Sequence, residues 1–412
     1  MTTDDPAASR ALSLPSDQEA SGRSLGEAEI AALAEVIASG TLTSTKGKQV
    51  AALEQAIADR LGVAHVIATS SGTAAIHAAV AALDPEPGDE IITTAVTDMG
   101  GLAPLLYQGA IPVFADVDPQ SLLVTPAAVE AVWSERTRAV IVTHLFGASC
   151  DLAAFRALCD RRGVALIEDA AQAWLTESDG RLAGTVGDLG CFSLQQGKHL
   201  TTGEGGVVVT DDPALARRVR LWVNKAWPYG EAGPDHEFLA LNARLSELQG
   251  AVGRAQFAKL DDMVAARCET AAIASAGLGS IAGLGVPLVR HGDRHTYWKF
   301  ALDVDAAVVA GGSIALASEL RLDGVQSAPR YIQKPAFATR VFVEQRTFGS
   351  SRWPFTLARP EALDYAPSRF PGTFAGLDRV LVLPWNERYG ASHARAVVDA
   401  VAAASARLRV SA

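Results

Sequence analysis

The sequence predicts an α/β fold, with a mainly parallel central sheet that carries helices on both faces and a smaller C-terminal α+β domain. Short apolar segments alternate with helical segments between residues 65 and 210, and this alternation is typical of parallel strands joined by crossover helices. Residues 277–285, GLGSIAGLG, then bring four glycines together and end the helical periodicity. Such a segment marks a boundary, so we expect a large domain at 24–280 and a small one at 281–412.

The composition excludes several classes of protein. The 412 residues are 49% hydrophobic, enough for two buried cores, and the net charge of −10 argues against nucleic acid as a partner, because phosphate contacts need clustered Lys and Arg. The four cysteines lack the CxxC spacing of zinc sites. No apolar run suits a membrane span or a secretory signal. We expect a cytoplasmic protein without a metal site or a membrane partner, and a flexible tail at 1–23.

The expected elements follow one another regularly along the chain. Short apolar runs predict seven strands, at 65–69, 90–94, 112–115, 139–143, 164–168, 191–194 and 207–210. Helical periodicity predicts helices at 25–38, 49–61, 101–107, 126–133, 152–162 and 213–223, one that ends at 83, and one bent helix or two at 245–276. In the small domain we expect a strand at 297–304 and helices at 313–320 and 394–408.

A candidate anion site follows the first strand. Ser71 and Gly72 form a tight turn that leads directly into an alanine-rich helix. The free N–H groups of a first helical turn favour a bound anion. Ser and Thr are also the usual first residues of any helix. The motif at 71–75 therefore fits either a phosphate site or an ordinary helix cap.

Two ionisable residues are expected near this turn. Asp169 follows the strand 164–168, where a carboxylate is costly to bury unless it has a partner, although it could also cap a following helix. Gln172 follows three residues later, close enough to converge with Asp169 if the chain turns helical there. Lys198 lies in a segment with four glycines between 197 and 206. That segment is either an exposed loop or a backbone shaped around one amine.

One cofactor accounts for these features. Pyridoxal 5'-phosphate requires a phosphate site, an amine for a Schiff base and an acid that keeps the pyridine nitrogen protonated. The turn at 71–75, Lys198 and Asp169 supply all three at the carboxyl edge of the predicted sheet, where the ligands of such sheets gather. The sequence therefore predicts a pyridoxal-phosphate site.

Four motifs, SSGTAA, IEDAAQA, FSLQQGKHLTTGEGG and LNARLSELQGA, occur in an order and spacing that resembles the DegT/DnrJ/EryC1/StrS family of sugar aminotransferases. The resemblance extends from about Ser24 to the C-terminus and implies the fold of type I pyridoxal-phosphate enzymes. It implies that Lys198 holds the cofactor and moves the proton, that Asp169 pairs with the pyridinium nitrogen, and that Gln172 binds the ring hydroxyl. It further implies a homodimer with shared active sites, and phosphate contacts from Gly72, Thr73, Ser193 and the neighbouring subunit's counterpart of Asn242.

Two positions depart from the family pattern. Asp98 stands where family members commonly have an aromatic residue that stacks on the cofactor ring. Either another group covers the ring face, or Asp98 contacts the substrate or the Schiff-base region. Trp174 follows the Asp-x-x-Gln motif in place of the usual histidine, and it could line the pocket or belong to the core. Further substrate candidates are Tyr229, Tyr331 and Arg244, the last of which could instead be structural.

The resemblance implies an enzyme that moves an amino group from glutamate or glutamine to a keto-sugar or keto-cyclitol, in aminosugar, aminocyclitol or antibiotic biosynthesis. The nearest alternative is a pyridoxal- or pyridoxamine-phosphate dehydratase or aminodehydratase of the same family, and the dehydratases carry histidine in place of the lysine. A non-catalytic member would be expected to lose Lys198 or Asp169, and both are present. A dinucleotide-dependent oxidoreductase is disfavoured, since no G-x-G-x-x-G follows the first strand.

Overall fold

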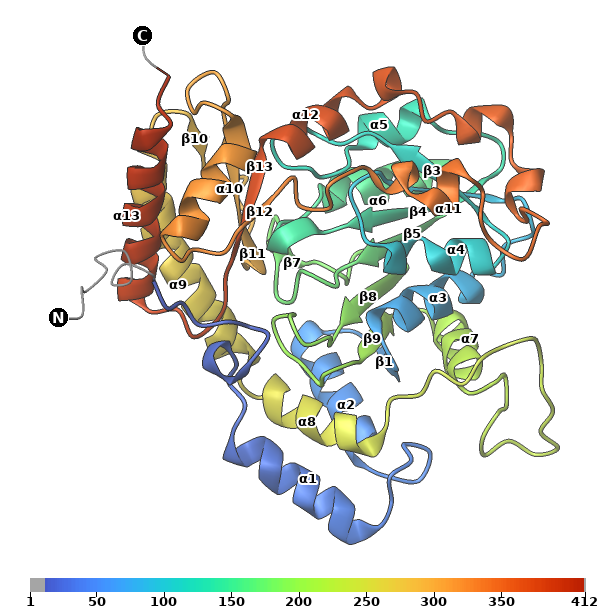
Figure 1. Ribbon diagram of the computed structural model, residues 1–412. Coiled ribbons are helices and arrows are strands. Elements are labelled where there is room, and N and C mark those ends of the chain that lie inside the picture. Colours follow the sequence, from blue (N-terminus) through green and yellow to red (C-terminus); the bar gives the residue numbers. More distant parts are fainter. Residues whose placement is uncertain (1–11, 411–412) are drawn as a thin grey trace.

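The computed structural model describes residues 12–410, and its largest feature is a seven-stranded sheet in the order β1-β9-β8-β5-β4-β2-β3 (Figure 1). The strands β2, β3, β4, β5 and β8 run parallel, whereas β9 is antiparallel to β1 and β8. The expected mainly parallel sheet is confirmed, and each predicted strand ends within two residues of its observed end. The strands are β1 (His65–Thr69), β2 (Glu90–Thr94), β3 (Ile111–Ala115), β4 (Thr137–Thr143), β5 (Ala165–Asp169), β8 (Leu189–Ser193) and β9 (Gly206–Thr210).

Helices cover both faces of this sheet because its strands direct apolar side chains alternately to either face. In β4, Val140 belongs to one buried cluster and Ile141 to the other. The first cluster includes residues of α2 (Gln49–Leu61), α5 (Pro126–Ala131) and α6 (Leu152–Arg162). The second includes residues of α3 (Gly72–Ala82), α4 (Ala103–Tyr107) and α7 (Pro213–Val223).

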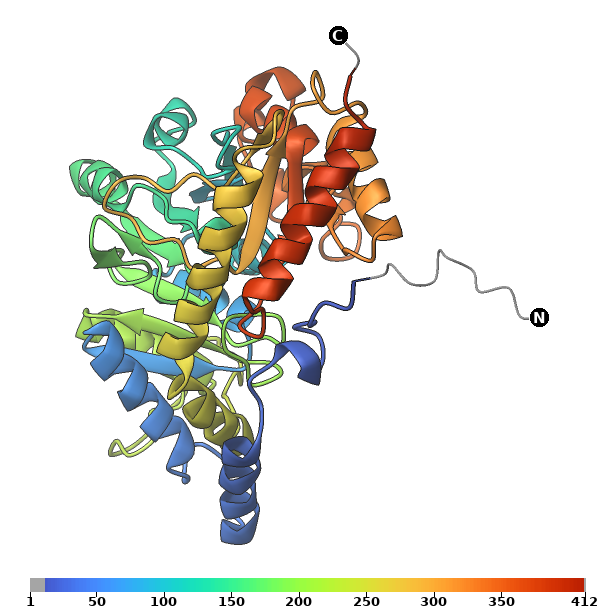
Figure 2. The ribbon, with the colours of Figure 1, turned by 90° about the vertical axis from the view of Figure 1, so that its left-hand side faces the viewer.

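The helical region expected at 245–276 forms two helices, α8 (Glu247–Phe257) and α9 (Leu260–Leu278). The first packs against α1 (Glu27–Ser39) and α2 of the large domain. The second packs along α13 (Ala391–Arg407), beside which it lies in Figure 2. Consecutive helices α8 and α9 therefore connect the large sheet with the C-terminal part of the chain.

The C-terminal part contains a four-stranded antiparallel sheet in the order β10-β11-β13-β12. Its core includes Phe300 and Leu302 of β11 and Leu381 and Leu383 of β13, all buried. The sequence predicts β11, α10 and α13 but not β13, the two-residue strands β10 and β12, or α12. The elements are β10 (Leu284–Gly285), β11 (Lys299–Val304), β12 (Ala328–Pro329), β13 (Val380–Pro384), α10 (Gly312–Leu322) and α12 (Pro371–Arg379).

A long aromatic segment, 331–379, connects β12 and β13 of the small sheet and packs against the large sheet between them. The ring of Phe114 in β3 lies 5.5 Å from that of Phe337 and 5.1 Å from that of Phe342, centroid to centroid. The division at residue 280 stays a prediction, and these buried contacts cross it.

Short elements complete the chain: α11 (Arg340–Val343), β6 (Glu177–Ser178), β7 (Arg181–Leu182) and 3-10 turns at Ala20–Gly22, Met99–Gly101, Leu145–Gly147, Ala336–Ala338, Phe355–Leu357, Pro360–Leu363 and Pro367–Arg369.

The flexible tail expected at 1–23 is wrong for its described part. Residues 1–11 lie outside the described residues, but from Leu12 on the chain packs against the small domain. Asp17 and Arg23 are buried. Burial of these charges is possible because each has an oppositely charged partner, Lys299 for Asp17 and Glu387 for Arg23.

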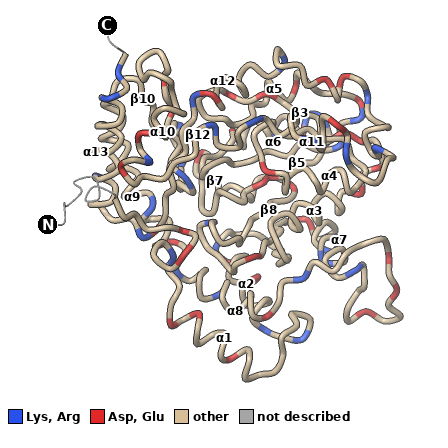
Figure 3. The backbone as a smooth tube through the Cα atoms, in the orientation of Figure 1, with Lys and Arg blue, Asp and Glu red and all other residues tan. Residues whose placement is uncertain are grey.

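Charged residues of both signs are interspersed along the chain, as Figure 3 shows. Within residues 12–410, no helix has the length and apolarity needed to cross a membrane. In the same residues, no three His, Cys, Asp or Glu side chains are grouped so that they could hold a metal ion. The four cysteines are free thiols.

Candidate active site

A cavity of about 350 Å³ lies at the carboxyl ends of the parallel strands. The start of α3, the end of β5, the loop between β8 and β9, and the residue before β11 contribute to its walls. All the residues predicted to hold the cofactor from within one chain line this cavity: Gly72, Thr73, Asp169, Gln172, Ser193 and Lys198. The substrate candidates Asp98 and Tyr331 line it too.

The turn between β1 and α3 forms a cradle against the end of β8. Ser71 caps α3, since its Oγ accepts the N–H of Ala74 at 3.0 Å. A Cβ on Gly72 would lie 2.9 Å from the Cβ of Ser193, so only glycine permits this approach of helix and strand. The Ser193 hydroxyl and the first-turn N–H groups of α3, which have no intrahelical acceptor, thus lie side by side at the cavity wall. Residues 71–75 can therefore serve both as a helix cap and as part of a phosphate site.

Asp169 is the last residue of β5 and is 6% exposed. Its Oδ1 accepts the N–H of Ala171 at 3.1 Å, and its Oδ2 lies 3.5 Å from Thr143 Oγ1. No helix follows Asp169 directly in the described chain, so the helix-cap interpretation is wrong. Burial raises the pKa of Asp169, against the opposing effects of the Ala171 N–H and the Lys198 charge. A cation in the cavity would offset the cost of burying this carboxylate.

The neighbouring residue, Glu168, supports the position of Asp169 from the other face of β5. It is fully buried and pairs with His144 at 2.8 Å. It also accepts the N–H groups of Gly184, Val186 and Gly187 at 2.6–2.7 Å. These bonds fix the end of β5 and the loop that follows it.

The Gln172 amide is held by two partners from distant parts of the chain. Its Oε1 accepts the N–H of Phe146 at 2.8 Å, and its Nε2 donates to the Tyr331 hydroxyl at 3.2 Å. The Tyr331 ring packs edge-on against that of Phe146, 4.7 Å between centroids. Burial raises the pKa of Tyr331 to about 12, so this hydroxyl stays protonated at neutral pH.

Lys198 extends from the loop between β8 and β9 toward the face of a tryptophan. Its Nζ lies 4.1 Å from the centre of the Trp298 ring. Burial lowers the pKa of Lys198 to about 8, while the charges of Asp169 and Asp98 act in the opposite direction. A lysine with this pKa is partly neutral near physiological pH, as a nucleophilic or basic amine must be.

Trp298 is a cavity residue that the sequence did not predict. It lies just before β11, within the strand expected at 297–304, and its indole N–H donates to Gly197 O at 2.6 Å. An aromatic residue in the YWKF run was the one sequence feature that could have suggested a site residue. The contact of this run with the lysine loop joins segments far apart in the sequence, so no local pattern predicts it. Other lining residues not assigned from the sequence are Thr97, Gly100, Gly101, Gln195 and Glu204.

Four predicted site residues lie outside this cavity within the chain. Trp174 is fully buried and stacks near Phe192, 4.3 Å between ring centroids, so it belongs to the core. Tyr229 and Arg244 line a separate cavity of about 200 Å³. The side-chain Oδ1 of Asn242 accepts the N–H of Arg244 at 3.4 Å. A role for Asn242 at a neighbouring subunit's cavity stays a prediction.

Asp98 lies at the wall of the cavity, two residues before a pair of glycines. Its Oδ1 accepts the N–H of Gly100 at 2.7 Å. A Cβ on Gly100 would lie 2.6 Å from Thr73 Oγ1. The carboxylate of Asp98 is therefore held next to the start of α3, in contact with the same space as Lys198.

Comparison with known proteins identifies the family. The model of the DegT/DnrJ/EryC1/StrS aminotransferase family matches residues 23–402. The chain is 37% identical over 288 residues to the L-glutamine:2-deoxy-scyllo-inosose aminotransferase of Streptomyces kanamyceticus, which covers 66% of this chain and 67% of that protein. It is 35% identical over 301 residues to the UDP-N-acetyl-3-dehydro-alpha-D-glucosamine 3-aminotransferase of Acidithiobacillus ferrooxidans, with coverages of 73% and 78%.

A solved structure supports the same identification. The aminotransferase TlmJ from Streptoalloteichus hindustanus is similar with a TM-score of 0.81 and 31% identity, over 94% of this chain and 98% of that chain. The chain therefore belongs to the DegT/DnrJ/EryC1/StrS aminotransferase family, and it is a pyridoxal-phosphate-dependent enzyme of fold type I.

Proposed function

We propose that this enzyme transfers an amino group from glutamate or glutamine to a keto-sugar or keto-cyclitol in the biosynthesis of an aminosugar or aminocyclitol. The observation that carries the proposal is the single cavity that holds Lys198, Asp169 and the cradle at the start of α3. Two similar proteins are named for amino transfer to an inosose and to a keto-sugar nucleotide. Their names support the class of acceptor, a polyhydroxylated ketone.

The cavity residues fit pyridoxal 5'-phosphate. The cradle of Gly72, Thr73 and Ser193 suits its phosphate, because N–H groups at a helix start attract anions. The buried, incompletely hydrogen-bonded Asp169 suits its protonated ring nitrogen. Gln172 suits its ring hydroxyl. When bound, this cofactor draws electrons from the substrate carbon that carries the nitrogen.

The remaining chemistry belongs to residues of the chain. Lys198 would hold the cofactor. Once its Nζ is free, it would take a proton from the substrate carbon that carries the nitrogen and deliver it to the C4′ carbon of the cofactor. Its lowered pKa of about 8 suits an amine that must both accept and release a proton. Trp298 covers Nζ on one side and limits the directions in which it can move. Asp98 and Tyr331 would contact the substrate from the cavity wall.

A family dehydratase is the alternative function, and the position of His199 argues against it. This histidine directly follows Lys198 but is fully buried, with Nε2 3.0 Å from Thr296 O. It does not line the cavity. The lysine is thus the residue available for base chemistry, as in an aminotransferase. An aminodehydratase that retains the lysine is distinguished from an aminotransferase by its product.

We also propose a homodimer in which Asn242 reaches the neighbouring subunit's phosphate site. The segment that holds Asn242 carries exposed apolar side chains, with Leu239 97% and Leu241 54% exposed. Apolar side chains grouped on a surface favour an interface. An Asn242→Ala variant is expected to bind the cofactor more weakly, measured by titration of the cofactor-free protein. Unchanged affinity would exclude the shared site.

A two-stage reaction tests the proposed function. The loaded enzyme is first converted with glutamate or glutamine, which removes the visible absorbance of the lysine-bound cofactor. Candidate ketones are then added, in parallel nucleotide-linked keto-sugars and free keto-cyclitols. Return of the absorbance together with an aminated product supports amino transfer. A product that has also lost water would instead identify an aminodehydratase.

A further inference from the structure

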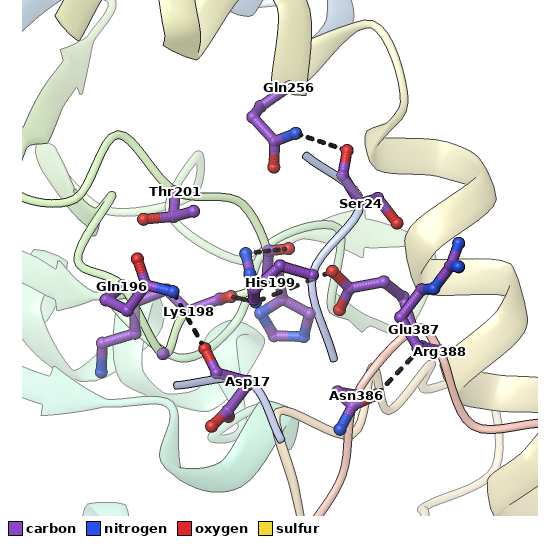
Figure 4. Close-up of polar contacts among 12 residues, drawn as sticks. Asp17, Ser24, Gln196, Lys198, His199, Thr201, Gln256, Asn386, Glu387 and Arg388 are labelled. Carbon is purple, nitrogen blue, oxygen red and sulfur yellow. Dashed lines mark hydrogen bonds and ion pairs between the residues drawn. The ribbon is translucent and has the colours of Figure 1, made fainter. Parts of the chain in front are cut away.

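An N-terminal segment, Pro15–Ser24, lies directly against the loop that carries Lys198, although 175 residues separate Arg23 from that lysine. Figure 4 shows Asp17 beside Gln196 and Lys198. The Gln196 amide donates to Asp17 O at 3.1 Å, and the Arg23 guanidinium donates to Lys198 O at 2.8 Å. Two residues of the lysine loop, Gln196 and Lys198, are thus bound by this segment.

The segment is fixed at both ends by other parts of the chain. Asn386, after β13, donates to Pro15 O at 2.7 Å. Gln256 and Lys259 donate to Ser24 O at 3.0 and 2.7 Å. Because both ends are anchored, residues 15–24 form a fixed wall behind the lysine loop.

The same wall carries a buried ion pair. Asp17 Oδ2 lies 2.6 Å from Lys299 Nζ, and both side chains are largely buried. Lys299 Nζ lies 5.2 Å from the centre of the Trp298 ring, the ring whose centre is 4.1 Å from Lys198 Nζ. Two lysine nitrogens therefore share one indole ring, and the charge of one of them is balanced by Asp17.

We propose that Asp17 is a positioning residue of the active site, which holds Lys299 and neutralises its charge beside the nitrogen of Lys198. The proposal rests on the proposed function, in which Lys198 holds the cofactor. Without Asp17, an unbalanced ammonium would remain at the Trp298 ring that Lys198 Nζ also faces, and it would disfavour the protonated form of the Lys198 nitrogen.

The charges around Lys198 give the sign of the effect. Burial has the largest effect on the pKa of Lys198 and lowers it. The carboxylates of Asp169 and Asp98 raise this pKa, Lys299 lowers it and Asp17 raises it. Burial would raise the pKa of Asp17 itself, but its contacts with Lys299, the Gln18 hydrogen bond and the Arg267 charge together outweigh burial and lower this pKa, so Asp17 stays ionised at neutral pH. Loss of Asp17 should lower the proton affinity of the Lys198 nitrogen, and loss of Lys299 should raise it.

Three variants of the cofactor-loaded enzyme test this proposal: Asp17→Asn, Lys299→Gln and the double variant. The readout is the pH midpoint of the visible absorbance of the lysine-bound cofactor, which changes when the Lys198 nitrogen gains or loses its proton. Asp17→Asn should lower the midpoint and Lys299→Gln should raise it, each by up to about one pH unit, the lower end of the shift that a close charge produces. The double variant should return to within a few tenths of the wild-type midpoint.

Asp261→Asn is a matched control, because Asp261 pairs with Arg60 at 2.6 Å on the surface, with 61% of its side chain exposed. Its midpoint should equal that of the wild type. A purely structural role for Asp17 predicts no shift, or shifts of the same sign in both single variants, and either result would overturn the proposal. A wild-type protein without visible absorbance would contradict the proposed function itself and the inference with it.

Discussion

Asp169 shows, at the scale of one residue, how the cavity is prepared for a cation. Its carboxylate ends a buried strand, and its Oδ2 reaches Thr143 Oγ1 at 3.5 Å, the limit of a hydrogen bond. Burial raises its pKa. A bound, protonated pyridine nitrogen would reverse this effect, because an adjacent positive charge favours the ionised carboxylate. Asp169 and the ring nitrogen would then stabilise each other's charged forms.

Replacement of Asp169 by asparagine should separate binding from turnover. An amide of the same size leaves the cavity filled but cannot hold the ring nitrogen protonated. We expect the variant to retain visible cofactor absorbance and to lose kcat by about a hundredfold or more, as when one preorganised electrostatic group is removed. Steady-state kinetics with glutamate or glutamine measure the loss. Full activity of Asp169→Asn would show that another group protonates the ring.

At the scale of elements, the close approach of α3 to the end of β8 builds the phosphate cradle. Gly72 permits this approach, since a Cβ there would meet the Cβ of Ser193 at 2.9 Å. The start of β9 is equally close, because a Cβ on Gly206 would lie 2.4 Å from Ser71 O. Three elements distant in sequence thus meet at one turn, and small residues at their contacts keep the N–H groups of α3 accessible.

A Gly72→Ala variant should therefore weaken cofactor binding while the fold is retained. The added methyl group must displace Ser193 or the start of α3, at a cost of about 1–3 kcal/mol for overpacking. If the displacement opposes cofactor binding by the same amount, the cofactor Kd rises roughly fivefold to 150-fold, measured by absorbance titration.

Two further variants make the test specific. Gly26→Ala is a matched control, because nothing lies within 4 Å of a Cβ at Gly26, and its cofactor Kd should equal that of the wild type. Ser193→Gly in the Gly72→Ala background removes the clash, although it also removes a hydroxyl from the cradle, and should recover part of the affinity. A wild-type cofactor Kd in the Gly72→Ala single variant would contradict the assignment of the cradle as the phosphate site.

At the scale of the whole molecule, the active site lies where the two sheets and the N-terminal segment meet. Lys198 and Asp169 come from the large sheet, whereas Trp298 lies just before β11 of the small sheet and Tyr331 shortly after β12. The aromatic segment 331–379 returns to the large sheet and buries Phe337 and Phe342 against Phe114. This packing holds the two parts of the cavity wall together.

Removal of one of these aromatic contacts should destabilise the whole chain. Phe342 is 1% exposed, and its truncation to alanine should cost about 3–5 kcal/mol of unfolding free energy, as for other buried Phe residues. Denaturant unfolding of the cofactor-free protein measures this loss. Phe348→Ala, at a side chain that is 41% exposed, is the control and should cost much less. Equal losses in the two variants would contradict the packing described.

The central chemistry of the site could be predicted from the sequence because its signals are local. A strand, a Ser-Gly turn and an alanine-rich helix form the cradle within a few residues, and the buried run before Asp169 puts that carboxylate at a strand end. The alternation of apolar segments was likewise sufficient for every strand of the large sheet.

The parts of the site that depend on distant contacts could not be predicted. Trp298 and Asp17 contact the lysine loop through folding that no local pattern encodes. The acidic, Ser-rich composition around Asp17 is typical of a flexible tail, whereas its ion pair with Lys299 and the hydrogen bonds that anchor the segment are contacts with distant residues. Trp174 was ambiguous because a tryptophan next to a site motif suits a core and a pocket equally well.

The assignment of Lys198 as the residue that carries the chemistry is tested most directly by the visible absorbance of the purified protein after loading with pyridoxal 5'-phosphate. The wild type should show an absorbance band from the lysine-bound cofactor. Lys198→Ala should lack this band although its cavity can still bind the free cofactor. A wild type without the band, or a Lys198→Ala variant that keeps it unchanged, would contradict the assignment of Lys198 as the residue that carries the chemistry.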